Sequence, residues 1–180
     1  MRQAFALTSM MGTACFIGCT KAASPDALEL FNTFDGNVVP KSSATAFVSA
    51  FDTFCVNAPD SIDDVDKALR DVSYVPTSTR NGTRLYIVDD SRPAIAISER
   101  SCAVRALSRT GQTDRVKRYM AETFPDAKTL TPAPFGKDVE QVWKVGEPRP
   151  GAILTNRTVE LGTTTSYTLI FLRQQGAGAT

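Results

Sequence analysis

Apolar residues recur first at helical spacing. Phe47, Phe51 and Phe54 lie three or four positions apart, which predicts a helix capped by Ser43 that ends before residues 57–59. A second helix is predicted after the capping residue Ser61, with its apolar stripe at Val65, Ala68, Leu69 and Val72. Because a short turn containing a proline joins them, we expect the two helices to pack as an antiparallel pair.

Further along, apolar residues form short β-rich runs separated by polar turns. Strands are predicted at 85–88, 94–98 and 102–107, with turns at 80–83, 89–93 and 99–101. A helix with Thr113 as its N-cap follows and ends at Pro125. An extended connector through Pro132 and Pro134 then leads to strands at 139–145, 152–161 and 164–172, with Gly162 and Thr163 as the last turn. The predicted class is α+β, a mainly antiparallel sheet with about three helices packed on one face.

The first 18 residues differ from this pattern and resemble a secretory signal peptide. Arg2 precedes an uncharged, largely apolar run from Ala4 to Gly18, too short to span a membrane comfortably as a mature helix. We therefore expect a signal peptide at 1–18, a lipidated tether at 19–42, one domain at 43–173 and a disordered tail at 174–180.

The end of this segment resembles the bacterial lipoprotein box. Phe16, Ile17 and Gly18 precede Cys19, although Phe16 stands where leucine is usual. The resemblance implies cleavage before Cys19 and lipidation of that cysteine, and Thr20 carries no signal for retention in the inner membrane. The implied location is the periplasmic face of the outer membrane. Ordinary signal-peptidase cleavage, giving a soluble periplasmic or secreted protein, stays open as the alternative.

The two cysteines of the expected domain, Cys55 and Cys102, are an even pair in an oxidising compartment. This arrangement predicts one structural disulfide. The alternative is a redox or metal-binding pair. No C-x-x-C spacing supports it, and two thiolates without histidine make a poor metal site.

The chain contains no histidine, which removes Ser-His-Asp and Cys-His catalysis and histidine-containing metal sites. It has no Ser-x-x-Lys and no Gly-x-Ser-x-Gly motif. The 20 basic and 19 acidic residues nearly balance, so nothing indicates a nucleic-acid partner. We expect no cofactor and no metal, and no residue is selected as catalytic.

Three groups of residues are candidate sites. Asp60, Asp63, Asp64 and Asp66 lack the central glycine and distal glutamate of a calcium loop, and fit better as acids at a helix start. Asp89 and Asp90 beside Arg92 fit a polar turn better than an acid–base pair. Trp143 is either a core residue or an exposed contact for a ligand.

Two strand regions, Arg84–Val88 and Ser101–Leu107, together with the signal, resemble small exported proteins and lipoproteins of alphaproteobacteria that have no assigned function. The resemblance implies no catalytic residue. We expect a non-catalytic binding or structural module of the cell envelope that its lipid anchors in the membrane. Its expected partner is an envelope protein or a small ligand. The alternatives are a carboxylate-dependent hydrolase of envelope glycans and an inhibitor that uses the Pro-rich stretch 131–136.

Overall fold

The computed structural model describes residues 41–59, 61–88, 91–159 and 164–174. The expected signal peptide, Cys19, nearly all of the expected tether and most of the expected tail lie outside these residues. Asp60, Asp89, Asp90 and the turn at Gly162 and Thr163 lie outside them as well. The expectations that concern these positions therefore stay predictions.

The described residues form three α-helices and one antiparallel sheet of eight strands, so the predicted α+β class is confirmed. The first half contains α2 (Ala44–Phe51), α3 (Ile62–Asp71), β1 (Val75–Arg80), β2 (Thr83–Ile87), β3 (Ala94–Ile97) and β4 (Ser101–Leu107). The second half contains α4 (Gln112–Thr123), β5 (Lys128–Leu130), β6 (Val139–Val145), β7 (Gly151–Val159) and β8 (Thr165–Arg173). Each half therefore ends in a run of four strands.

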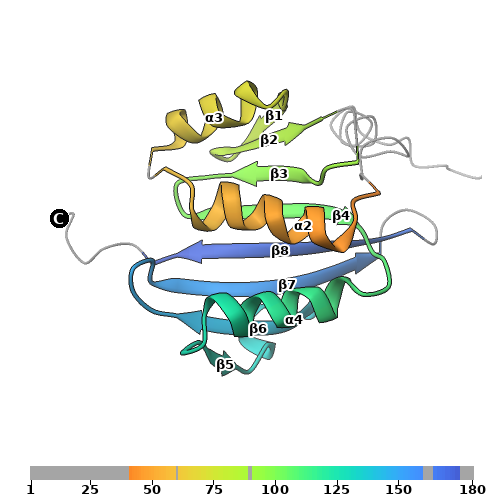
Figure 1. The fold of residues 1–180 in the computed structure, drawn as a ribbon, viewed down its shortest axis with the longest axis vertical. Coiled ribbons are helices and arrows are strands. Elements are labelled where there is room, and N and C mark those ends of the chain that lie inside the picture. Colours follow the sequence, from red (N-terminus) through yellow and green to blue (C-terminus); the bar gives the residue numbers. More distant parts are fainter. Residues whose placement is uncertain (1–40, 60, 89–90, 160–163, 175–180) are drawn as a thin grey trace, which may run out of the picture.

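The strand order is β1-β2-β3-β4-β8-β7-β6-β5. Strands β4 and β8 meet in the middle, where Val104 pairs with Leu169, and join the two four-stranded meanders into one sheet. Helix α2 lies over β4 and β8, and α4 lies over β6 and β7 (Figure 1). The sheet therefore has one face that α2 and α4 cover and an opposite face.

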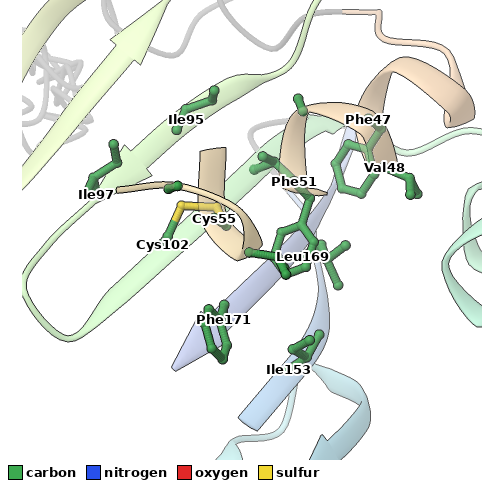
Figure 2. Close-up of a cluster of buried hydrophobic side chains, with 14 of the residues drawn as sticks. Phe47, Val48, Phe51, Cys55, Ile95, Ile97, Cys102, Ile153, Leu169 and Phe171 are labelled. Atoms are coloured by element: carbon green, nitrogen blue, oxygen red, sulfur yellow. A yellow bond between two sulfur atoms is a disulfide. The ribbon is translucent and has the colours of Figure 1, made fainter. Parts of the chain in front are cut away.

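The predicted first helix is confirmed, including its cap. The Ser43 hydroxyl accepts a hydrogen bond from the Ala46 amide, and the helix continues through a π-helical turn, η1 (Asp52–Val56), that ends before Asn57. Its aromatic side chains Phe47 and Phe51 are fully buried in one core cluster with Leu169 of β8 (Figure 2), and the Phe47 ring lies 5.7 Å from that of Tyr167 on the same strand. Burial of such a side chain contributes about 1.5–3 kcal/mol, so this contact anchors α2 to the sheet.

The expected antiparallel packing of the first two helices is wrong. The helix that packs against α2 is α4, with Phe51 and Tyr119 in edge-to-face contact at 6.1 Å. Helix α3 contacts β2 instead: Arg84 donates to the Asp63 carboxylate at 3.1 Å, and the Tyr86 hydroxyl donates to Asp66 at 2.5 Å. These polar contacts place α3 near the edge of the sheet.

The third helix begins at a different residue from the one predicted. Gly111, with a φ of +85°, is the N-cap, and Gln112 is the first helical residue. The buried Gln112 side chain accepts from the Arg109 amide at 2.8 Å and donates to the Leu107 carbonyl at 3.1 Å. A side-chain amide therefore fixes the entry to α4, and Thr113, the expected cap, lies inside the helix.

Two strands were not predicted. β1 contains Pro76 and is exposed at almost every position, and β5 is three exposed residues long, so neither shows an apolar pattern. Both lie at the edges of the sheet. The predicted turn at Asn81 and Gly82 joins β1 to β2, with positive φ at both residues, as a two-residue hairpin requires.

Candidate functional site: an arginine-lined groove

A groove of about 800 Å³ lies at one end of the sheet. The β1–β2 turn, the β3–β4 turn and the end of β8 meet there, because these strands alternate in direction. Its described lining residues are Ile62, Thr79, Asn81, Gly82, Thr83, Arg84, Ser98, Glu99, Arg100, Ser101, Leu172 and Arg173. The set combines three arginines with four hydroxyl side chains.

The charge of the groove is positive. Arg84, Arg100 and Arg173 line it, and Glu99 is the one acidic residue among the described residues of its lining. Arginine always carries its charge and presents several N–H donors in a planar fork, which suits carboxylate and phosphate oxygens. Hydroxyl groups both donate and accept hydrogen bonds. The lining therefore suits an anionic ligand that also bears hydroxyl groups.

The local structure holds Arg84 in place. Arg84 lies on β2 just after the Asn81–Gly82 turn, and its guanidinium donates to the Asp63 carboxylate at the start of α3. This hydrogen bond raises the pKa of Arg84 above its ordinary value. Side-chain exposure is 38% for Arg84, so part of the guanidinium still faces solvent.

The β3–β4 turn is held by its two serines. The Ser98 hydroxyl accepts from the Ser101 amide at 3.0 Å and from the Arg100 amide at 3.3 Å. The Ser98 amide donates to the Ser101 carbonyl at 2.8 Å, and the two hydroxyls lie 2.9 Å apart. The Arg100 carbonyl accepts from the Arg173 amide at 3.0 Å, which ties the turn to β8. Arg100 is thereby fixed beside the groove on a rigid turn.

A smaller cavity of about 250 Å³ lies between α4 and the neighbouring strands. Half-buried Trp143 lines it with Lys117, Met120 and Phe124, and also packs against the main core. The indole therefore packs against the core, as one of the two interpretations of Trp143 expects, and also lines this cavity, so the interpretation as a ligand contact stays a prediction. Within 131–136, Ala133–Phe135 form a 3₁₀ turn, and Phe135 is 38% exposed.

A second polar cluster lies beside α4 around Arg157. Its guanidinium donates to Glu140 at 2.6 Å and to Thr113 at 3.1 Å, and also contacts the Ser108 hydroxyl. The same group stacks over the Tyr167 ring at 4.6 Å. These contacts join β7 to β6, β8 and the start of α4. The guanidinium is occupied by this network, so the cluster is structural rather than a ligand site.

The predicted disulfide residues lie in the core. Cys55 and Cys102 are fully buried, and their Cα atoms are 5.3 Å apart, within the range of a disulfide (Figure 2). The pair links η1 to β4. This geometry supports the structural interpretation of the two cysteines.

The acidic residues of α3 have structural partners. Asp63 pairs with Arg84, and Asp66 accepts from Arg70 at 2.7 Å and from Tyr86. The hydrogen bond from Arg70, followed by that from Tyr86, lowers the pKa of Asp66 below its ordinary value. Within the described residues, His, Cys, Asp and Glu side chains form no group of three that would hold a metal ion. Asp63 and Asp64 lie in the first turn of α3, as the helix-start interpretation expects.

The groove arginines form no motif in the amino-acid sequence. They lie far apart in the chain, and their charges are diluted locally by Glu99 and other acids.

None of the helices in the described ranges has the length and apolar character needed to cross a membrane. Comparison of the chain with protein-family models, curated proteins and solved structures gives no match. The groove is the feature on which a function is inferred.

Proposed function

We propose that the protein is a non-catalytic binding module of the cell envelope whose groove binds anionic, hydroxyl-bearing ligands of the sugar-phosphate class. The observation that carries the proposal is the lining of the groove: three arginines and four hydroxyl side chains in about 800 Å³, a size typical of small-ligand sites. Arginine forks bind phosphate oxygens, and hydroxyl and amide groups bind the sugar.

The rival interpretation, a carboxylate-dependent hydrolase, receives less support from this groove. Glycoside hydrolysis ordinarily needs two carboxyl groups that flank the scissile bond. In the described part of the lining, Glu99 lies among arginines and has no second carboxylate beside it. A groove with this charge suits binding of an anion better than protonation and hydrolysis of a neutral glycan.

The test is an NMR titration of the protein with glucose 6-phosphate, using glucose as the uncharged control. We expect the phosphate ester to shift the amide signals of Thr83, Arg100 and Ser101, which line the groove. Glucose should shift them much less at the same concentration, because it lacks the anionic group. Equal shifts with both sugars, or shifts confined to residues outside the groove, would contradict the proposal.

The location in the envelope rests on the lipoprotein-box resemblance at Cys19. We propose that the mature chain begins at this residue and carries lipid on its thiol and amino group. Mass spectrometry of the N-terminal peptide from the exported protein tests this directly. A chain that begins after Ala23, with no added lipid mass, would show ordinary signal-peptidase cleavage and a soluble exported form instead.

A further inference from the structure

The face of the sheet opposite α2 and α4 carries an apolar row that crosses its central strands. The strand register aligns one residue from each of six neighbouring strands, β2 to β4 and β6 to β8. These residues are Leu85, Ala96, Ala103, Ile170, Leu154 and Val142. Such a row is unusual on a face that only water covers, where polar residues normally alternate with buried ones.

The alternation of side chains fixes which face the row occupies. Its chain neighbours Tyr86, Ile95, Val104 and Leu169 belong to the core cluster beneath the helices, so the row points the other way. Val142 and Leu154 are buried, at 0% and 5% exposure, yet they are not members of that core cluster. The opposite face therefore has an apolar centre of its own.

The charge on this face has one sign. Among its paired strand positions, the charged residues are Arg80, Arg105, Lys128 and Lys144. Arg105 is half-buried and lies opposite Thr168 of β8 in the strand register. Its guanidinium donates to the Ser166 hydroxyl at 3.2 Å. Burial lowers the pKa of Arg105, because a charged guanidinium is costly away from water. A partner that is both apolar and acidic fits this surface.

We propose that residues 26–35 of the same chain bind along this face. The segment contains Asp26, Glu29 and Asp35 and no basic residue, and its apolar residues are Ala27, Leu28, Leu30, Phe31 and Phe34. It thus offers both properties that the face requires. A second copy of the chain fits less well, because two such faces packed together would bring basic residues against basic residues.

The length of the chain allows this contact. Asp35 lies six positions before Lys41, where the described chain starts, and an extended chain spans about 20 Å over six positions. Helix α2 begins at the end of the sheet where β8 starts (Figure 1). Arg105 lies near the end of β4, which pairs with the start of β8. The segment therefore has only to pass around this end of the sheet to meet Arg105.

Photo-crosslinking within the full exported chain tests the contact. Phe31 is replaced by p-benzoylphenylalanine, a change that keeps an aromatic side chain, and the irradiated protein is mapped by mass spectrometry. We expect crosslinks within one chain to residues such as Ala103, Thr168 and Ile170 on the opposite face. A mixture of isotope-labelled and unlabelled chains separates these products from crosslinks between copies.

Charge reversal supplies the second measurement. Arg105→Glu should lower the yield of the intrachain crosslink about fivefold, since one favourable charge pair is worth about 1 kcal/mol. Arg118→Glu, exposed on α4 and therefore on the side of the sheet that the helices cover, is the matched control and should leave the yield unchanged. Crosslinks to the helices, crosslinks between copies, no intrachain product, or equal effects of both reversals would each overturn the proposal.

Discussion

At the scale of single residues, charge and burial separate the arginine-lined groove from the structural polar contacts. Arg84 and Arg100 line an open groove, whereas Tyr119 is buried at 7% exposure and donates to Asp52 at 2.7 Å. Burial, followed by the hydrogen bond to Asp52, raises the pKa of Tyr119 well above its ordinary value. The phenol therefore stays neutral in the folded protein and serves to join α4 to η1.

This shift predicts a loss of stability in alkali. A tyrosine in the unfolded chain ionises near pH 10, but folded Tyr119 does not, so stability is fully present below about pH 10 and falls as the pH rises further. Tyr119→Phe should flatten this dependence and cost about 1 kcal/mol at neutral pH through the lost hydrogen bond. Urea unfolding at pH 7 and at pH 10.5 to 11 (roughly the window in which free tyrosine ionises) measures both effects.

In Tyr119→Phe, the free energy of unfolding should still fall somewhat as the pH rises, because burial also raises the pKa of Tyr86 and of Tyr167. The slope should therefore become shallower without vanishing. An unchanged slope in Tyr119→Phe would show that the Tyr119 hydroxyl does not resist ionisation in the fold.

At the scale of elements, apolar periodicity predicted the buried helices and strands and missed the exposed ones. The strand at 139–145 was predicted with its observed bounds, since Val142 and Val145 are buried. The apolar pattern did not indicate β1 and β5, because edge strands have few buried positions and therefore few apolar residues. The groove could not be predicted from the sequence for another reason: its residues come from two turns and a strand end that meet only when the sheet forms.

Gly151 gives a prediction at this scale. It starts β7 opposite Arg173, and a Cβ there would lie 2.7 Å from the Phe171 ring and closer still to the Leu172 carbonyl oxygen. Gly151→Ala should therefore destabilise the fold by about 2 kcal/mol through overpacking against backbone. Gly146→Ala is the control, because nothing lies within 4 Å of the added carbon. Equal unfolding midpoints for the two variants would contradict this packing.

At the scale of the whole molecule, the class was predicted from blocks of helices and strands, but the topology was not. Sequence separation does not reveal that β4 pairs with β8, which joins the two meanders. The core between α2 and the central strands contains side chains from both halves, including Phe47 and Phe171. We therefore expect the described residues to unfold as one cooperative unit.

The Cys55–Cys102 link should stabilise this unit through the unfolded state. The two cysteines are 47 positions apart, and closing a loop of that length contributes about 4 kcal/mol in the chain-entropy model. The double variant Cys55→Ala/Cys102→Ala should lose about that much free energy of unfolding, measured in urea. Thiol titration of the wild-type protein, unfolded in urea without a reductant, should detect no free thiol at Cys55 or Cys102. Two reactive thiols there would contradict the link.

Calorimetry with glucose 6-phosphate tests most sharply our proposal that the arginine groove binds anionic, hydroxyl-bearing ligands. Native protein should bind the phosphate ester well above glucose, and Arg100→Gln should weaken that binding about tenfold, the worth of one hydrogen bond to a charged group. Arg109→Gln should leave it unchanged, and Glu99→Gln should strengthen it by removing the acidic charge of the lining. Equal affinity for both sugars, or unaltered affinity in Arg100→Gln, would contradict the account.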